Sequence, residues 1–137
     1  MVLPPHIVER IASILATTET NGMHVDHEAA RYGGIALMGT IGATWLLRPD
    51  GTFWDVDDDS GRPLTPLADK DHVTALACGV KRYPWLAVLL PERPVSAVDC
   101  NACDARGWFP SAQGGIGEIQ CLYCEGLGWL RDVRPAG

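Results

Sequence analysis

The residues best suited to chemistry form a duplicated cysteine pattern near the end of the chain. A Cys-x-x-Cys-x-x-x-Gly-Trp unit begins at Cys100 and again at Cys121, with matched positions 21 residues apart. Two cysteines separated by two residues can direct both sulfurs at one metal ion, and two such pairs complete a tetrahedral site. The gap of 17 residues between the pairs is typical of zinc ribbons. The sequence therefore predicts one structural zinc ion with four ligands: Cys100, Cys103, Cys121 and Cys124.

The predicted zinc ion is structural because four thiolates close its coordination sphere. A catalytic zinc keeps one position open for water. A rubredoxin-like iron site and a thiol redox pair are the alternatives. A redox pair normally has one exposed thiolate of low pKa, and nothing in the sequence singles one out. The fifth cysteine, Cys78, is not needed as a ligand and is predicted to flank the buried stripe of a helix.

We call residues 100–107 the first knuckle and residues 121–128 the second knuckle. The second knuckle, Cys-Leu-Tyr-Cys-Glu-Gly-Leu-Gly, resembles the C-x-x-C-x-G-x-G unit of the DnaJ-type cysteine-rich zinc domain. The first knuckle has Ala105 where that unit has its first glycine. If this position needs a positive φ, alanine costs about 1 kcal/mol there. We therefore expect the first knuckle to be wound differently.

The resemblance covers residues 100–129, and this stretch has two of the four units and half of the zinc capacity of the family's domain. In that family the cysteine-rich region contacts unfolded or partner proteins, so the resemblance implies a protein-contact role. It does not imply co-chaperone activity, because the sequence contains no His-Pro-Asp signature of a J domain.

Two tryptophans and a glycine-rich stretch accompany the knuckles. Residues 113–117 are predicted to form the tip of a hairpin that joins them. Trp108 and Trp129 are predicted to pack around the knuckles or against the rest of the protein. The alternative for both side chains is a recognition surface.

The first 94 residues predict an α+β domain of helices and a small antiparallel sheet. Apolar residues at helical spacing indicate a first helix over 7–20, followed by a polar stretch over 23–32 that is predicted to be a loop or a short turn of helix. Residues 33–56 predict β structure, with a Pro-Asp-Gly turn at 49–51. A second helix is predicted over 70–82, with Asp69 as its N-cap.

Prolines divide the chain after this second helix. Residues 85–90 form an apolar run that is either a short helix or a buried strand, and their Leu and Ala content favours helix. Pro91 to Pro94 mark a boundary. The predicted organisation is an α+β domain over 1–94, a zinc-ribbon module over 95–132 and a tail over 133–137.

Two polar clusters are weaker candidates for a site. Residues 24–28, His-Val-Asp-His-Glu, hold four metal-binding or acid–base side chains, and His72 is a candidate partner for them. Surface residues and a local polar role for His72 are the simpler interpretation. Residues 55–59 begin like a calcium-binding loop, but Ser60 and Pro66 replace its required Gly and Glu. We interpret them as a solvated acidic turn, with a patch for a basic partner as the alternative.

Charge and missing motifs narrow the function. The 137 residues carry a net charge of −6, and residues 1–99, with eight basic and thirteen acidic side chains, contribute −5. Nucleic acid is therefore not the expected partner, whereas an acidic surface can steer a basic protein. The P-loop, nucleophile-elbow and dinucleotide motifs are absent. No secretory signal or membrane-spanning run is seen, so the expected location is the cytoplasm, where thiols stay reduced.

The sequence thus predicts a small acidic zinc-binding protein with a protein-interaction role, as an adaptor or an inhibitor. A bacterial toxin-neutralising immunity protein fits this size and charge. The alternatives are a zinc-ribbon nucleic-acid-binding protein and an enzyme with its site around His24 to Glu28. We make no prediction of the oligomeric state.

Overall fold

The computed structural model describes residues 1–39, 43–57, 59–110 and 118–131. Its helical elements are α1 (Pro5–Asn21), α2 (His24–Arg31), η1 (Asp69–Asp71), α3 (His72–Arg82), η2 (Pro84–Leu89) and η3 (Asn101–Cys103). Its strands are β1 (Ile35–Met38), β2 (Thr44–Leu47), β3 (Phe53–Val56), β4 (Pro63–Pro66), β5 (Val98–Asp99), β6 (Trp108–Pro110), β7 (Glu118–Gln120) and β8 (Trp129–Leu130). The predicted hairpin tip at 113–117 and the tail at 133–137 lie outside the described residues.

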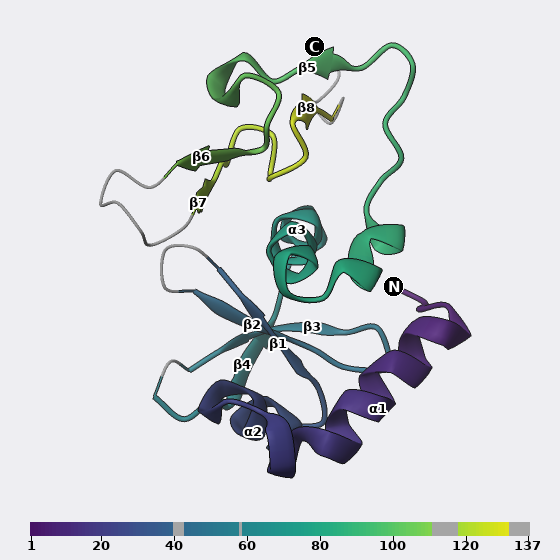
Figure 1. The fold of residues 1–137 in the computed structure, drawn as a ribbon, viewed down its shortest axis with the longest axis vertical. Helices are drawn as coiled ribbons and strands as arrows, with labels where there is room; N and C mark the ends of the chain where they lie inside the picture. Colours follow the sequence, from purple (N-terminus) through teal and green to yellow (C-terminus); the bar gives the residue numbers. More distant parts are fainter. Residues whose placement is uncertain (40–42, 58, 111–117, 132–137) are drawn as a thin grey trace.

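The amino-terminal part is a three-layer α+β arrangement around an antiparallel meander (Figure 1). The strands pair in the order β1-β2-β3-β4. Ile35, Leu47 and Phe53 are register partners on one face, and they join α1, α3 and η2 in the main core. Ala36, Leu46 and Trp54 alternate with them and face α2. This alternation follows from the two-residue period of a strand and confirms the predicted fold class.

Several predicted elements are present. The apolar period over 7–20 is the buried side of α1, whose Ile7 and Ile11 are fully buried. The turn at 49–51 joins β2 to β3, with Gly51 at φ +86°. The Asp50 carboxylate accepts hydrogen bonds from the backbone N–H and hydroxyl of Thr52. The apolar run at 85–90 is helical, as its composition favours, and forms the 3₁₀ helix η2.

The structure differs from the local expectations at three places. Residues 23–32 were expected to form a loop or a short turn of helix, and they contain the two-turn helix α2, in which Asp26 accepts the backbone N–H of Met23 and so caps the first turn. Strand β4 was not predicted; its prolines lie on an edge strand, where a missing N–H is tolerated. Asp69 is not the N-cap of α3, since it begins the 3₁₀ turn η1 and the helix starts at His72.

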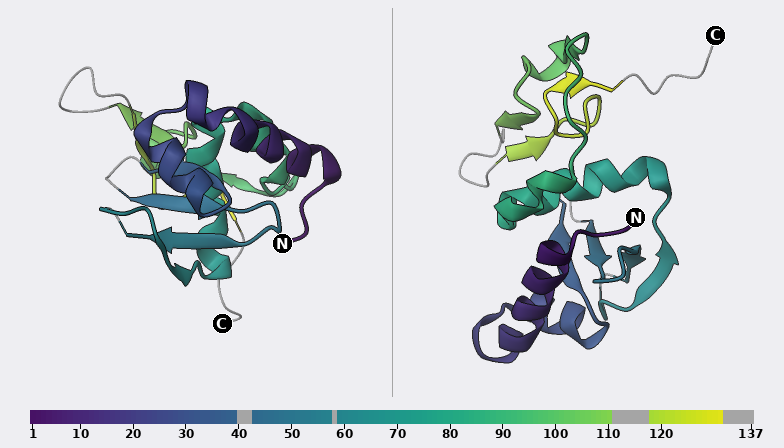
Figure 2. Two further views of the ribbon diagram at one scale, coloured as in Figure 1. Left: turned by 90° about the horizontal axis from the view of Figure 1, so that it is seen from below. Right: turned by 90° about the vertical axis from the view of Figure 1, so that its right-hand side faces the viewer.

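The described residues of the cysteine-rich part, 98–110 and 118–131, form the two knuckles and four short strands, and they lie beyond α3 on the side away from the sheet (Figure 2). The strand before each knuckle pairs with the strand after the other knuckle. Thus β5 pairs with β8 and β6 pairs with β7, in equivalent registers. The sequence duplication therefore becomes an approximate two-fold symmetry. Across the part of the chain that the structure describes, no helix is long and apolar enough to cross a membrane.

Candidate metal centre

The two knuckles bring the four predicted ligands together. Their sulfurs all lie within 4.8 Å of one another, and all four cysteines are buried. The Sγ atoms of Cys100 and Cys121 are 3.8 Å apart, and those of Cys103 and Cys124 are 3.6 Å apart. Two bonds of about 2.3 Å at a tetrahedral zinc ion place their sulfurs about 3.8 Å apart. A disulfide needs about 2.05 Å, so the arrangement fits a metal and not a disulfide.

Backbone hydrogen bonds hold the sulfurs in the same way in both knuckles. The N–H of Gly107 donates to Cys103 Sγ at 3.2 Å, and the N–H of Gly128 donates to Cys124 Sγ at 3.3 Å. Such N–H groups stabilise negative thiolates and fix their direction. The N–H of Cys100 donates to the carbonyl of Gly128, and that of Cys121 donates to the carbonyl of Gly107. Each knuckle is therefore tied to the other as well as to itself.

The pKa values of the thiols are consistent with a site that needs a cation. Burial raises the pKa of Cys124 to about 12 and also raises that of Cys100. Burial alone would raise the pKa of Cys103 too, but hydrogen bonds from Gly107 and the other thiols lower it to about 7. One thiolate is thus stabilised by its neighbours, whereas a positive charge nearby would favour the deprotonation of Cys100 and Cys124. A divalent metal ion supplies that charge.

The expectation that Ala105 changes the winding of the first knuckle is wrong. Ala105 has φ +62° and its counterpart Gly126 has φ +90°, so both adopt the left-handed region. The N–H groups of both residues donate to the carbonyl of the first cysteine of their knuckle. Closure around the sulfurs therefore imposes a left-handed backbone at this position in both knuckles, and in the first knuckle the alanine carries the strain.

Two glycines are required where the knuckles meet. A Cβ on Gly107 would lie 2.3 Å from the carbonyl oxygen of Gly126, and one on Gly128 would lie 2.4 Å from that of Ala105. Both glycines also have positive φ. The glycine of each repeated unit is thus required because the backbones of the two knuckles approach closely there.

Sequence reasoning missed Gln120, which attaches the centre to helix α3. The side chain is buried, and its Nε2 donates to the carbonyl oxygens of Thr74 at 3.0 Å and Glu125 at 2.9 Å. Its Oε1 accepts a hydrogen bond from the Cys78 thiol at 3.1 Å. Cys78 therefore lies in the contact between the two parts of the protein, and not merely beside a helix stripe. A polar residue directly before Cys121 was a signal, but its partners on α3, Thr74 and Cys78, lie more than 40 residues away in the chain.

The two tryptophans pack within the protein, which is the first of the two roles predicted for them. Trp129 is 8% exposed. Trp108 is half-buried, and the Lys81 ammonium of helix α3 lies 4.3 Å from its ring centroid. Lys81 also pairs with Glu118 of β7. The Trp108 ring thus contributes to the contact with α3 through a cation–π interaction.

The cluster at residues 24–28 does not converge on one point. His24 pairs with Glu28 along the helix surface, His27 Nε2 lies 3.1 Å from the carbonyl of Gly22, and Asp26 binds Arg82. His72 stacks on Phe53, with its Nε2 3.2 Å from the carbonyl of Leu67, which is a local role.

The acidic residues Asp55, Asp57 and Asp59 lie at the end of β3 and in the turn after it, and Asp58 is outside the described residues. In this turn, the Asp57 carboxylate accepts the backbone N–H of Asp59. The described residues that gather as possible metal ligands are the four cysteines.

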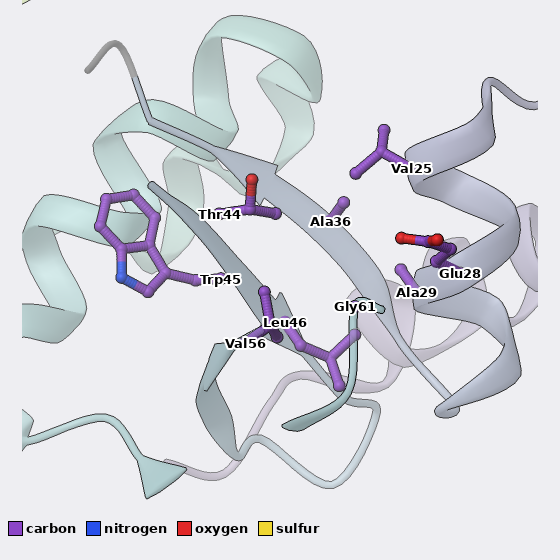
Figure 3. Close-up of a pocket in the computed structure, with 9 residues that line it drawn as sticks. All are labelled: Val25, Glu28, Ala29, Ala36, Thr44, Trp45, Leu46, Val56 and Gly61. Atoms are coloured by element: carbon purple, nitrogen blue, oxygen red, sulfur yellow. The ribbon is translucent and has the colours of Figure 1, made fainter. Parts of the chain in front are cut away.

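Two hollows lie in the amino-terminal part. The one in Figure 3 lies between α2 and the sheet, and its volume of about 20 Å³ is close to that of one water probe. The other, about 160 Å³, lies beside Asp26, whose carboxylate is already bound by Arg82 and the Met23 N–H. Sites for small organic ligands are commonly about 300–1,000 Å³, so both hollows are smaller than such sites.

Comparisons with known proteins give one local likeness. A protein of Oryza sativa subsp. japonica, described as "Probable lysine-specific demethylase SE14", is 38% identical over 45 residues. These residues make up 33% of this chain and 3% of that protein. No protein-family model matches the chain, and no solved structure matches it. The DnaJ-type resemblance is therefore a likeness of a short motif, without a matching family model.

Proposed function

We propose that this acidic protein binds one structural zinc ion and acts as a non-catalytic protein-interaction module. The observation that carries the proposal is the surface of the second knuckle. Leu122 and Tyr123, between two of the metal ligands, are 63% and 78% exposed. The matched residues of the first knuckle are the smaller Asn101 and Ala102.

A metal-held turn is a favourable place for apolar contact residues. The backbone around Leu122 and Tyr123 is fixed by the flanking cysteines, so little conformational entropy is lost when a partner binds. Tyrosine is enriched in binding hot spots because it offers a large ring and a hydroxyl group. Val98 and Leu130 are paired across β5 and β8 and add exposed apolar area to this cysteine-rich part.

The charge supports a basic protein as the partner of an adaptor or inhibitor. The excess of acidic residues lies before residue 100, so this part would steer the approach while the second knuckle makes the contact. A toxin-neutralising immunity protein is one form that such an inhibitor takes. We place the protein in the cytoplasm, where thiols remain available to the metal.

Two observations favour a protein-interaction role over nucleic-acid binding and over an enzymatic activity. A nucleic-acid role would use the arginines of the cysteine-rich part, but Arg131 is held in a two-bond ion pair with Glu125. An enzyme would need the side chains at residues 24–28 to act together, and they have separate partners.

The test compares surface variants of the zinc-loaded protein. Leu122→Ser with Tyr123→Ser should abolish capture of a specific partner from native lysate, measured by quantitative mass spectrometry. Val88→Ser is the matched control, because Val88 is 62% exposed on η2. Zinc content should be unchanged in both variants. Equal capture by the double variant and the wild type would contradict the proposal, as would specific retention of nucleic acid with a steep salt dependence.

A further inference from the structure

Helix α3 contacts the sheet with one face and the cysteine-rich part with another. One face carries Leu76 and Val80, which belong to the main core with residues of the sheet, and Gly79 lies against Leu37 of β1. The other face meets the cysteine-rich part through four residues at helical spacing: Thr74, Ala77, Cys78 and Lys81. Positions i, i+3, i+4 and i+7 share one side of a helix. The metal centre therefore lies against an element that also forms the main core.

Gln120 is the buried polar connection across this contact, and the Lys81–Glu118 ion pair is a more exposed one. Its amide nitrogen binds the Thr74 carbonyl of α3 and the Glu125 carbonyl of the second knuckle, while its amide oxygen accepts the Cys78 thiol. The next residue in the chain is the ligand Cys121, whose N–H is bound by Gly107 of the first knuckle. The backbone position of Gln120 is thus set by closure of the two knuckles around the metal.

Comparison of the two repeated units shows that the Gln120 hydrogen bonds to α3 have no counterpart at the matched position of the first unit. The residue that matches Gln120 is Asp99, whose exposed carboxylate pairs with Arg93 and not with α3. Gly126 approaches α3 so closely that a Cβ there would lie 2.9 Å from the Cβ of Ala77. The matching residue in the first knuckle is Ala105, which is exposed. Of the two knuckles, the second lies against α3, and it has the smaller residue at this position and the bonded amide before its first cysteine.

We propose that Gln120 makes the metal centre a switch on helix α3. With metal bound, the amide holds the second knuckle against the helix and keeps Cys78 buried at 2% exposure. Without metal, the knuckles lose the bonds that fix their backbone, and Gln120 is no longer held beside Thr74 and Cys78. Loss of the metal then loosens α3 and exposes its second face, including the Cys78 thiol. This inference rests on the metal centre and is independent of the proposed partner-binding role.

The first test separates the Gln120 contact from metal binding. Gln120→Ala is compared with the wild type and with Asp99→Ala at the matched position, all as full-length, zinc-loaded protein under reducing conditions. Each is treated with iodoacetamide, and alkylation of Cys78 is followed by peptide mass spectrometry. We expect Gln120→Ala to keep its zinc and to react at Cys78 about tenfold faster than the wild type, whereas Asp99→Ala reacts at the wild-type rate. Zinc-loaded Gln120→Ala that reacts at the wild-type rate would overturn the proposal.

A second measurement uses the wild type and does not depend on folding of a variant. Zinc is removed with a chelator in the presence of reductant, and amide hydrogen exchange is compared before and after. We expect exchange over residues 74–82 to accelerate about tenfold or more, and restored zinc to reverse the change. Acceleration confined to the two knuckles would show that α3 does not respond to the metal, and the switch would be rejected.

Discussion

Ala105 shows how strongly a single backbone position is constrained by the metal centre. It adopts φ +62° in the first knuckle, where the matching residue of the second knuckle is glycine. A left-handed conformation costs an L-residue roughly 1–2 kcal/mol, because Cβ approaches the following carbonyl. Formation of the four-sulfur site therefore outweighs the local preference of alanine.

Replacing this residue should stabilise the protein. Ala105→Gly removes the steric cost, part of which is offset by the greater freedom of glycine in the unfolded chain. We expect the free energy of unfolding of the zinc-loaded protein to rise by about 1 kcal/mol in chemical denaturation. The reverse change, Gly126→Ala, should lower it by more, because the added Cβ would meet Ala77 at 2.9 Å and Gln120 at 3.0 Å. A neutral or destabilising Ala105→Gly would show that the first knuckle is not strained.

At the scale of elements, an ion pair joins helices α2 and α3. The Arg82 guanidinium donates to both carboxylate oxygens of Asp26, and the Tyr83 hydroxyl donates to one of them at 3.4 Å. Burial alone would raise the pKa of Asp26, but hydrogen bonds from Arg82 and the Met23 N–H hold it below its ordinary value. The Asp26 carboxylate therefore caps the first turn of α2 and also binds α2 to the end of α3.

This tie makes the protein sensitive to acid. A depressed folded-state pKa gives stability that is complete above the unfolded pKa of about 3.9 and is lost as the pH falls through the folded value. Asp26→Asn should lower the free energy of unfolding by about 2 kcal/mol at pH 7, and by less at pH 3. Urea denaturation of the wild type and of Asp26→Asn at both pH values measures the difference in the free energy of unfolding. Metal loss at low pH affects both proteins, so it largely cancels in this difference. A difference that does not shrink at pH 3 would contradict the assignment.

At the scale of the whole molecule, the two parts differ in what stabilises them. The main core joins large apolar residues from α1, the sheet, α3 and η2. The buried cluster of the cysteine-rich part consists of the four cysteines, with Phe109 packed against it. So little apolar burial cannot offset the entropy of ordering a glycine-rich chain, and metal binding must supply the remainder.

Metal content and folding should therefore change together in the cysteine-rich part. Elemental analysis should find about one zinc ion per chain in the wild type and in Cys78→Ser, and little in Cys124→Ser. Cys121→Ser with Cys124→Ser should unfold this part and leave α1 and the sheet partly folded, as followed by circular dichroism and hydrogen exchange. Iron in the wild type would contradict the zinc assignment. Complete unfolding of the double variant would contradict the division into an amino-terminal domain and a module.

The contribution of the sequence was greatest where the physics is local. The four ligands could be named because two residues between cysteines suffice to place both sulfurs on one metal. Helix α1 followed from the helical spacing of its apolar residues, and strands β1 to β3 followed from short apolar runs and the turn at 49–51. The choice between a loop and a short turn of helix at 23–32 stayed open because the residue that caps α2 is an aspartate inside the helix. Strand β4 was missed because prolines are uncommon within strands.

The tertiary structure alone decided how the two parts are joined. Gln120 binds Thr74 and Cys78, which lie more than 40 residues away in the chain. The spacing of apolar residues does not indicate such a contact. It also decided the winding at Ala105, where closure of the site overrides local preference. Spacing along the chain fixed which residues can bind the metal, because that geometry is local. Packing between distant segments fixed what the metal centre is attached to, because that depends on every element between them.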